Sequence, residues 1–388
     1  MNKVSSLTAI QNPQASGEQV VEAGNTQGQT LYGCLKKIPQ YVFIAINLLL
    51  VIAMNFCAYT THLPSQVYPN YSYFGMMFPI FLMGSTAFIV FWLVFKRKYT
   101  LISLVGMLLC GSSIRCYCPL NVPTEPPEGC IKVMSYNVMG FGKHDTIPWE
   151  ENKIVQYINH SQADIVCLQE AHGTKKTSLN ELFDSIYPYL AIDTIKKEAY
   201  TAILSKFPIL GKERIGYNSE TNASFAYTLL LNRDTVLVVN NHFESYKLND
   251  KDKDDYKTIL KDPENDDNEQ RYDSLIHKLK VANTTRAAQA DSVAAYITKH
   301  PYKYILCVGD FNAPSLSYTH YRLTQLLDDA YTRSGNGPGI SYNRSGMYFR
   351  IDNILISPNI TPYRAKVDAF SKESDHYPII SQLKFGKE

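Results

Sequence analysis

Two long uncharged segments near the start of the chain constrain its fold more than any other feature. Residues 38–59 form a run of 22 residues without a charged side chain, and residues 73–95 form a second run of 23. A helix needs about 20 apolar residues to cross the hydrocarbon core of a bilayer. Each segment is therefore predicted to be a transmembrane helix, and the first third of the chain must be considered apart from the rest.

A third apolar segment, residues 99–115, is shorter and has charged flanks. It follows Lys96, Arg97 and Lys98, and it carries Arg115 at its end. Such a segment can span a bilayer if its terminal side chains snorkel to the surface, or it can be re-entrant. We predict three spans, at residues 38–59, 73–95 and 99–115, within a transmembrane region of residues 31–117. Two spans are the alternative.

The basic residues predict the orientation of these spans, because short loops rich in Lys and Arg stay in the cytoplasm. Lys36 and Lys37 precede the first span and the basic triplet follows the second, whereas residues 60–72 between them contain no Lys or Arg. Three spans would therefore place everything after residue 117 outside the cytoplasm, in the periplasm if the source is bacterial. Two spans would leave it in the cytoplasm.

The segments on either side of the transmembrane region have different compositions. Residues 1–30 are rich in Gln, Asn, Ser and Gly without helical or strand periodicity, which predicts a disordered cytoplasmic tail. Residues 118–129 form a proline-rich linker. Cys116, Cys118 and Cys130 bracket it and allow a disulfide in an oxidising compartment. Cys167 and Cys307 fall inside apolar runs and are expected to be buried.

Residues 130–388 alternate between strand-like and helix-like patterns. IKVMSYN and ADIVCLQ flank a segment with apolar residues at helical spacing, and several later runs are joined by short turns typical of antiparallel strands. A helix is predicted over residues 284–299. This mixed order favours a layered α/β domain over a doubly wound parallel sheet. The charged residues 247–280 are expected to be a solvated helical excursion or, alternatively, a rim that selects the substrate.

Short polar motifs in this domain follow apolar, strand-like runs. Each run, such as TVLVVNN or YILCVG, brings carboxylate, amide or imidazole groups to its carboxyl end. Because α/β proteins gather such strand ends around one cleft, we expect these groups to lie together. Acids, amides and histidines suit a hard cation combined with proton transfer at a phosphate ester. The residues are Asn137, Glu170, His242, Asp310, Asn312, Asp352, Asp375 and His376.

Individual roles follow from the chemistry of the side chains. Asp310 and Asn312 alternate at a strand end and are expected on one side of the sheet, Asp310 to deprotonate water and Asn312 to bind a phosphoryl oxygen. Asp352 lies inside an apolar run, where a partner such as His376 would remove most of its burial penalty. His242 is a candidate general acid for the leaving oxygen.

Taken singly, each motif also has a structural explanation, such as a strand-end Glu170, a satisfied structural His242 or an Asx-type turn at Asp375. The combination is far more specific. In this order, the motifs resemble the endonuclease/exonuclease/phosphatase superfamily, which includes pancreatic deoxyribonuclease, neutral sphingomyelinase and inositol-polyphosphate phosphatases. The resemblance covers residues 130–388 and touches every motif, and the membrane region lies outside it.

The resemblance implies a four-layer α/β sandwich, in which two mixed β-sheets flanked by helices pack face to face. It also implies Mg²⁺ or Mn²⁺ as cofactor, with Asn137 and Glu170 on the metal side and Asp375 near the metal. Of the catalytic residues, Asp310 would activate water and the histidines would stabilise or protonate the phosphorane-like state. The catalytic set that it implies is His242, Asp310, Asn312, Asp352 and His376.

Some motifs of this sequence differ from those of individual branches of the superfamily, and these differences only partly indicate the branch to which the chain is most similar. The strand bearing His242 looks like the deoxyribonuclease and sphingomyelinase pattern, whereas abasic-site endonucleases carry a tyrosine there. GDFNAP lacks the GDxNYR form of inositol-polyphosphate phosphatases, and no PxWCDR-like string precedes Asp352. Residues 247–280 are unlike the apolar hairpin by which secreted sphingomyelinases grip bilayers. None of these comparisons identifies a substrate.

The sequence thus predicts a membrane-anchored, divalent-metal-dependent phosphoesterase that uses activated water and no covalent intermediate. A nucleic-acid phosphodiesterase is favoured, and a phospholipid or sugar-phosphate esterase is the alternative. The charge balance weakens the nuclease prediction, because acidic residues slightly outnumber basic ones after residue 128. A catalytically silent binding module is the third possibility, against which the complete set of motifs argues. The sequence indicates no protein partner.

Overall fold

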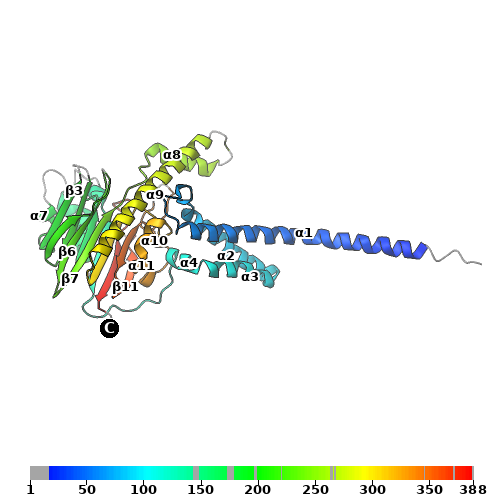
Figure 1. Ribbon diagram of the computed structural model, residues 1–388, viewed down its shortest axis with the longest axis horizontal. Helices are drawn as coiled ribbons and strands as arrows, with labels where there is room; N and C mark the ends of the chain where they lie inside the picture. Colours follow the sequence, from blue (N-terminus) through cyan, green and yellow to red (C-terminus); the bar gives the residue numbers. More distant parts are fainter. Residues whose placement is uncertain are drawn as a thin grey trace, which may run out of the picture.

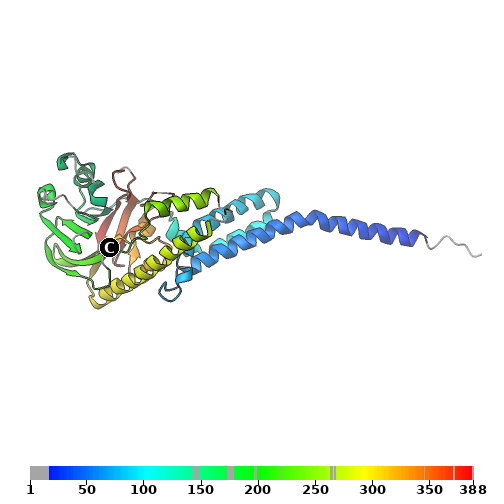
Figure 2. The same cartoon turned by 90° about the horizontal axis from the view of Figure 1, so that it is seen from above.

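Apolar helices and a layered α/β domain make up the two parts of the chain (Figure 1). The computed structural model describes residues 17–142, 148–172, 179–195, 199–219, 221–262, 265, 268–344, 346–369 and 372–386. The helices extend from one end of the α/β domain, and the amino-terminal end of the first helix lies farthest from it (Figure 2).

The helical part runs back and forth beside the domain. Helix α1 leads toward the α/β domain, α2 leads away from it, and α3 and α4 return (Figures 1 and 2). Short 3-10 helices η1 and η2 lie between α1 and α2, and η3 lies between α2 and α3. The bounds are α1 (Gly17–Thr60), η1 (Pro69–Tyr71), η2 (Phe74–Met77), α2 (Phe78–Phe95), η3 (Arg97–Tyr99), α3 (Thr100–Leu109) and α4 (Gly111–Tyr117).

Two helical segments are long and apolar enough to cross a membrane, as predicted. They are Ile38–Thr60 and Pro69–Phe95. The third predicted span corresponds to Arg97–Leu109 and Gly111–Tyr117, which are bent by 71° relative to each other. A bend of this size fits either a broken span or a re-entrant segment, so both readings of the third segment stay open.

Polar side chains inside the helical part bond between helices. Ser103 Oγ donates to Asn47 Oδ1 at 2.8 Å, and Asn55 Nδ2 donates to the Gly106 carbonyl oxygen at 3.1 Å. Both pairs join α1 to α3, the first of them fully buried and the second partly buried. Interhelical hydrogen bonds and small residues such as Gly106 are the usual means by which membrane helices associate.

The predicted disordered tail is corrected in part. Residues 1–16 lie outside the described residues, but residues 17–30 belong to α1 rather than to a disordered segment. Extending a helix that already exists costs far less than nucleating one, and Gln, Glu and Ala in this stretch are good helix formers. Composition alone does not reveal that the adjoining span supplies the nucleus.

Two six-stranded mixed sheets form the α/β domain. Strands β1 and β2 are parallel in the first sheet and β7 and β8 in the second, while the remaining pairs are antiparallel. The first sheet has the order β11 (Ile360–Val367), β12 (Ile379–Phe385), β1 (Ile131–Asn137), β2 (Ile165–Gln169), β4 (Ala199–Ser205) and β3 (Tyr189–Ile195). The second has the order β5 (Ile209–Arg214), β6 (Ala223–Leu231), β7 (Asp234–His242), β8 (Tyr304–Asp310), β10 (Asp352–Ile356) and β9 (Asp328–Asp329).

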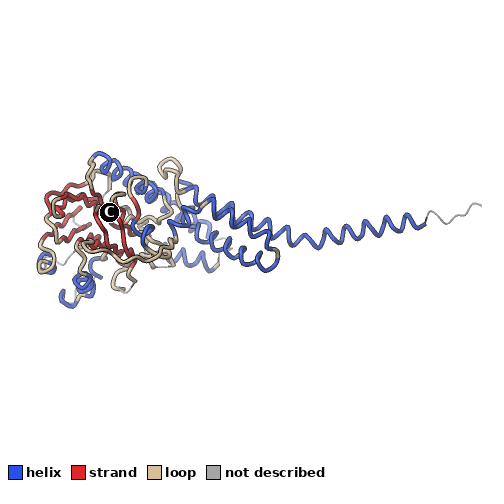
Figure 3. The backbone as a smooth tube through the Cα atoms, turned by 90° about the horizontal axis from the view of Figure 1, so that it is seen from below, coloured by secondary structure: helices blue, strands red, loops and turns tan. Residues whose placement is uncertain are grey.

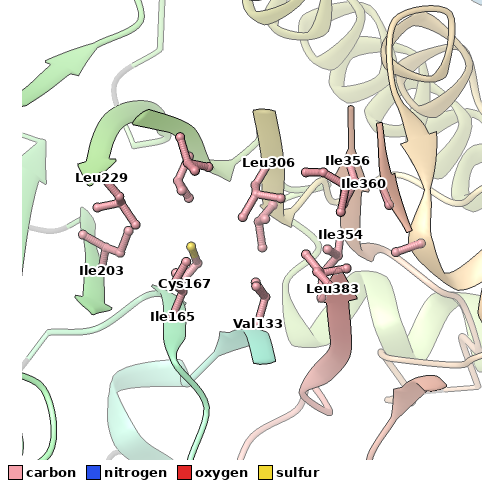
Figure 4. Close-up of a cluster of buried hydrophobic side chains, with 14 of the residues drawn as sticks. Val133, Ile165, Cys167, Ile203, Leu229, Leu306, Ile354, Ile356, Ile360 and Leu383 are labelled. Atoms are coloured by element: carbon pink, nitrogen blue, oxygen red, sulfur yellow. The ribbon is translucent and has the colours of Figure 1, made fainter. Parts of the chain in front are cut away.

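The sheets pack face to face, and helices cover their outer faces. Figure 4 shows the core between the sheets, where Val133 and Ile165 of the first sheet lie opposite Leu306 of the second. Helices α6 and α7 pack on the outer face of the first sheet, and α9 and α10 pack on that of the second. The strands lie between these helical layers (Figure 3). The predicted four-layer sandwich is therefore confirmed.

The remaining helices lie in the connections between strands. The predicted helix over residues 284–299 is the second half of a longer one, α9. The charged residues 247–280 are largely helical, as expected, in α8 and the start of α9. The bounds are α5 (Met139–Gly142), η4 (Trp149–Glu151), α6 (Lys153–Ser161), α7 (Leu179–Phe183), α8 (Asp250–Lys261), α9 (Asn268–Lys299), α10 (Tyr318–Thr324) and α11 (Ala330–Ser334).

The loop between α1 and α2 is hydrogen-bonded to helix α9 of the α/β domain. Gln66 Nε2 donates to Asp291 Oδ2 at 2.8 Å, and Thr284 Oγ1 donates to the Ser65 carbonyl oxygen at 3.2 Å. Asn283 Nδ2 donates to the carbonyl oxygen of Ser72 at 3.1 Å. These contacts fix the α/β domain directly against the end of the apolar helices.

Gly75 in η2 makes the tightest approach at this junction. A Cβ atom there would lie 2.1 Å from the Leu316 carbonyl oxygen and 3.2 Å from Thr61 Cγ2. We expect Gly75→Ala to push the α/β domain away from η2 and to lower stability by about 1–3 kcal/mol, as overpacking does. Thermal unfolding of the full chain in detergent checks this. Gly216→Ala, where nothing lies within 4 Å, is the control, and equal melting temperatures for both variants would contradict the prediction.

A buried polar cluster joins α4 to the α/β domain. Arg350 Nη1 donates to Asp329 Oδ2 at 2.8 Å, and Arg350 Nη2 donates to the Cys116 carbonyl oxygen at 2.9 Å. The His320 ring lies between the two, with Nε2 3.3 Å from Asp329 Oδ2 and Nδ1 3.8 Å from Cys116 Sγ. Cys116, Cys118 and Cys130 are free thiols, so the disulfide that the sequence allowed is absent here. Cys167 and Cys307 are buried, as predicted.

The cluster predicts how stability depends on pH. Burial lowers the pKa of His320, but Cys116 and Asp329 outweigh burial and raise it to about 9 from an ordinary value of 6.5. A histidine whose pKa is raised in the folded chain stabilises the fold at pH values below its ordinary pKa. This stabilisation is lost as the pH rises through the folded-state pKa. We expect the melting temperature to fall between about pH 6.5 and pH 9.5 more steeply in the wild-type chain than in His320→Gln. Parallel curves would contradict this.

Candidate active site

The predicted residues meet at one edge of the paired sheets. Asn137, His242 and Asp310 end their strands, and Glu170 directly follows β2, as predicted. Asp352 instead begins β10, which corrects the expectation that it lies at a carboxyl end. Because β10 is antiparallel to β8, its start lies beside the end of β8, and Asp352 pairs with Asp310 in register.

The motif SDH likewise precedes a strand, β12, rather than following one. Ser374 Oγ donates to the carbonyl oxygen of Asn137 at 2.8 Å and accepts the backbone N–H of His376 at 3.2 Å. This serine therefore ties the loop to the end of β1. Sequence reasoning missed it, although a Ser two residues before a His is a recognisable turn signal.

Asp310 lies at the centre of the cluster and is fully buried. Its Oδ2 accepts from Asn137 Nδ2 at 3.0 Å, and the Nε2 atoms of His376 and His242 lie 3.7 and 3.9 Å away. Burial raises the pKa of Asp310, which the two histidines oppose and Asp352 reinforces, to about 6. This carboxylate is ionised at neutral pH yet basic enough to accept a proton.

Asn312 lies beside Asp310, as predicted, but the prediction that both lie on one strand is wrong. Its φ is 49°, in the left-handed region, so the chain turns directly after β8. The Asn312 backbone N–H donates to Asp310 Oδ1 at 2.7 Å, which closes an Asx-type turn. Its Nδ2 donates to Asp310 Oδ2 at 3.2 Å and to the Phe243 carbonyl oxygen at 2.9 Å. The turn thus keeps the amide next to the carboxylate by a different route.

His376 and Asp352 form the predicted pair. His376 Nδ1 lies 2.8 Å from Asp352 Oδ2, and both residues are buried. Burial opposes a charge on the ring, but Asp352 and Asp310 outweigh it and raise the pKa of His376 to about 10. The ring is therefore an imidazolium at neutral pH, with Nε2 directed toward Asp310. Tyr342, which sequence reasoning missed, packs edge-on against this ring at 5.1 Å between centroids.

Glu170, Asn137 and Asp375 are the predicted metal-side residues. Glu170 Oε1 accepts from Asn137 Nδ2 at 3.1 Å and lies 3.7 Å from His242 Nε2. Burial raises the pKa of Glu170, but the histidines and Asn137 outweigh it, so the pKa lies below its ordinary value. Asn137 Oδ1 accepts the backbone N–H of Met139 at 3.1 Å, so its amide presents N–H to the carboxylates. Asn137 therefore bridges Glu170 and Asp310 in this arrangement.

The donor set fits a divalent cation. Glu170, Asp310 and Asp375 line one pocket of about 180 Å³. Carboxylate oxygens are the ligands that Mg²⁺ and Mn²⁺ prefer, and a cation would offset the repulsion between the acids. The Glu170 side chain is 39% exposed. An ion that enters from solvent can therefore reach its carboxylate.

By spacing alone, Asp310, Asp352 and His376 are a second possible set of metal ligands, since one ligand atom from each lies within 4.8 Å of the others. We favour a proton there instead of an ion. The 2.8 Å hydrogen bond between His376 and Asp352 already uses Nδ1. An ion would have to displace the proton that the two carboxylates hold on the imidazole ring.

The pocket wall combines polar and apolar residues. Leu248, Met347, Phe349 and Ile351 line it together with the acids and His376. Residues from the start of the charged stretch 247–280 also line it, so this stretch is both a helical excursion and part of the rim. All eight predicted residues are brought together. Five line the pocket, Asn137 and Asp352 are hydrogen-bonded to residues that line it, and His242 Nε2 lies within 3.9 Å of Glu170 and Asp310. The roles assigned to them from the sequence stay predictions.

Two family profiles match the chain. That of the Endonuclease/Exonuclease/phosphatase family matches residues 134–376, which begin within β1 and end at His376. That of a domain of unknown function matches residues 40–117, which correspond to the apolar helices. No curated protein sequence matches the chain significantly.

Solved structures with low sequence identity are similar to the α/β domain. A truncated Caenorhabditis elegans TDP2 is 17% identical, with 66% of this chain and 97% of that chain covered and a TM-score of 0.46. An endonuclease/exonuclease/phosphatase family protein from Bacteroides thetaiotaomicron is 16% identical, with 66% and 95% covered and a TM-score of 0.47. A mannosyl-6-phosphatase from the same bacterium is 17% identical, with 66% and 100% covered and a TM-score of 0.45.

Proposed function

Because the chain belongs to the Endonuclease/Exonuclease/phosphatase family, we propose that it is a divalent-metal-dependent phosphoesterase that hydrolyses its substrate with an activated water. The observation that carries the proposal is the position of Asp310. This buried carboxylate lies within 3.9 Å of two histidines and is hydrogen-bonded to two asparagines, in a pocket shared with Glu170 and Asp375. The pocket thus offers a base, cationic groups and metal ligands together.

Each group has a distinct task. Glu170 and Asp375 would hold Mg²⁺ or Mn²⁺, with Asn137 aligning Glu170. When bound, the ion supplies Lewis-acid polarisation of the phosphoryl oxygens. Asp310 accepts a proton from the attacking water, which suits a carboxyl group with a pKa of about 6. Asp310 is also aligned for this by the N–H groups of both asparagines.

The histidines act on developing negative charge. The His376 imidazolium, held by Asp352, presents Nε2 to the pocket and stabilises the phosphorane-like state. His242 lies 3.7 Å from Glu170 and 3.9 Å from Asp310, close enough to protonate the leaving oxygen after a small movement. Asn312 contacts a phosphoryl oxygen. No side chain in this arrangement is needed as a nucleophile, so hydrolysis takes a single step.

The rim supports a small or membrane-borne ester over a nucleic acid, the substrate that the sequence favoured. Binding of a polynucleotide relies on several cations that are available to phosphates. The rim lysines Lys247 and Lys253 are instead paired with Glu244 and Asp250. By volume, a sugar-phosphate ester also fits the pocket of about 180 Å³. A silent binding module is disfavoured because every proposed catalytic group is in place.

The ends of the apolar helices support an extracytoplasmic location. The loop that joins α1 to α2 bonds to the α/β domain, and it contains no Lys or Arg. The basic triplet Lys96–Lys98 lies at the other end, where Lys96 Nζ donates to Gln40 Oε1 at 2.7 Å. By the positive-inside rule, the end with the triplet is cytoplasmic and the α/β domain is outside the cell membrane.

The test uses the full chain in detergent micelles with bis(p-nitrophenyl) phosphate, p-nitrophenyl phosphate and plasmid DNA. Turnover of at least one substrate is expected with Mg²⁺ or Mn²⁺ and should fall at least about 100-fold in EDTA. Glu170→Gln should raise the Mg²⁺ concentration needed for half-maximal rate, whereas Glu213→Gln on the exposed strand β5 should not. A folded chain that neither binds Mg²⁺ nor hydrolyses any of the three would overturn the proposal.

A further inference from the structure

The wall of the catalytic pocket touches the apolar helices. Tyr246, which lines the pocket, donates its hydroxyl hydrogen to Met76 Sδ at 3.7 Å. Met76 lies in η2, two residues before α2 begins. The Tyr246 ring also stacks on the buried Arg286 guanidinium, 4.0 Å from the ring centroid. One rigid side chain therefore links the catalytic pocket to the start of a segment that is apolar enough to cross a membrane.

A narrow crevice extends from the pocket toward the same helix end. Pro314 and Phe349 line both the pocket and the crevice. On its far side the crevice is lined by Met76 and Pro79 at the start of α2, and Tyr348 borders it. Its volume is only about 10 Å³, so an alkyl chain would lie along its rim, over the exposed Tyr348, and not inside it. Among the described residues that line the crevice, Arg350 is the only charged one, and most of the others are apolar or aromatic.

Exposed aromatic residues mark the level of the bilayer surface at this end. Tyr59, Tyr68 and Tyr71 are 63%, 45% and 40% exposed and flank or occupy the loop between α1 and α2. Tyr and Trp side chains gather at membrane–water interfaces. The segment Ile38–Thr60 is about 35 Å long at 1.5 Å per residue, enough to reach from this level across a bilayer. The catalytic pocket, which adjoins Met76, therefore lies just above the surface.

The pocket itself matches an amphiphile. Glu170, Asp310, Asp375 and His376 line it, where a metal and a phosphate would bind, and the apolar residues Pro314, Met347 and Phe349 line it as well. A sugar phosphate has no apolar part for these apolar residues. A lipid has both a phosphate group and alkyl chains that emerge from the membrane at this level.

We propose that the substrate is a membrane lipid that carries a phosphate ester, bound with its phosphate at Asp310 and Glu170 and with its apolar chain leading over Phe349 and Tyr348 to the bilayer. The inference rests on the proposed phosphoesterase function. The attacking water forms a bond to phosphorus, the bond from phosphorus to the leaving oxygen breaks, and that oxygen takes a proton. Both a lipid phosphomonoester and a lipid phosphodiester satisfy this chemistry.

The test uses the full chain reconstituted into phosphatidylcholine vesicles with Mg²⁺. One set of vesicles contains phosphatidic acid, a monoester, and another contains phosphatidylglycerol, whose headgroup is joined through a diester. Bis(p-nitrophenyl) phosphate is the soluble ester, and plasmid DNA is included. We expect hydrolysis of one doped lipid, and the identity of that lipid distinguishes the monoester from the diester. We also expect soluble ester turnover.

Variants test the path to the bilayer. Tyr348→Glu should lower the ratio of lipid to soluble-ester turnover at least about tenfold, the usual scale for an apolar contact with a substrate. Leu210→Glu is the matched control, because Leu210 is 57% exposed on β5, at the end of the sheet away from the pocket, and its ratio should not change. An unchanged ratio in Tyr348→Glu would overturn the inference.

The outcomes separate the two proposals. Soluble-ester turnover with Mg²⁺ but no hydrolysis of either lipid would overturn the lipid inference and leave the phosphoesterase function standing. Cleavage of plasmid DNA in preference to lipid would overturn it in favour of a nuclease. Silence on every substrate by a folded chain would overturn both.

Discussion

Asp310→Asn is expected to lower kcat for phosphate ester hydrolysis by at least about 1,000-fold, because the change removes the proposed base and a charge between two histidines. The amide has the same shape as the carboxylate, so the backbone around it need not move. An amide cannot accept a proton from water at neutral pH. The measurement is kcat on whichever soluble ester the wild-type chain hydrolyses, at saturating Mg²⁺.

The same substitution should leave stability unchanged or raise it. Burial raises the pKa of Asp310 to about 6, so the ionised carboxylate is less favourable in the folded chain than in the unfolded one at neutral pH. Replacing it with a neutral amide removes that cost. Loss of activity without loss of melting temperature separates a catalytic role from a structural one.

Asp234→Asn is the matched control for this prediction. Asp234 begins β7, at the end of the strand away from His242, and pairs with Lys303 on the exposed surface. Its kcat should stay within about twofold of wild type, since exposed ion pairs contribute little. An Asp310→Asn chain that keeps more than about a tenth of wild-type kcat would contradict the assigned role.

The pair of His376 and Asp352 gives the second large effect. His376→Gln should lower kcat about 1,000-fold, because it removes the imidazolium that faces the developing negative charge. Asp352→Asn should lower kcat about 100-fold, since the ring stays but loses the carboxylate 2.8 Å from Nδ1 that holds its charge and orientation.

Because Asp352 is proposed to act only through His376, the two losses should not add. The double variant should resemble His376→Gln alone, as expected for residues that work as a unit. A double variant whose loss is the product of the single losses would show that Asp352 acts independently. Circular dichroism and thermal unfolding of all three variants are needed, because Asp352 is fully buried.

The site was predictable where burial makes a polar group costly. Asp352 in an apolar run requires a partner, and the sequence offers His376 for that place. Local turn geometry was not accessible in the same way. The alternation of Asp310 and Asn312 suggested one continuous strand, but a left-handed φ at Asn312 ends it. Ser374 and Tyr342 were missed because their contacts with β1 and His376 join positions far apart in the sequence.

The fold shows the same limit. Central strands such as β7 and β8 are continuous apolar runs, and the sequence predicts them well. Strands β3, β9 and β11 were not predicted, and all three lie at sheet edges. Edge strands pair on one side only, so they tolerate polar residues and even Pro362 in β11, which erases the periodic signal. The helical residues 17–30 were missed because they carry no helical period of their own and only continue the helix of the adjoining apolar segment.

The most direct measurement of the central claim is phosphate ester hydrolysis by the full chain in isotopically labelled water, with Mg²⁺ and again with EDTA. A metal-dependent phosphoesterase that uses activated water predicts a single labelled oxygen in the phosphoryl product of one turnover, and no product in EDTA. Product formed in EDTA, or unlabelled phosphoryl product from a single turnover, would contradict the account.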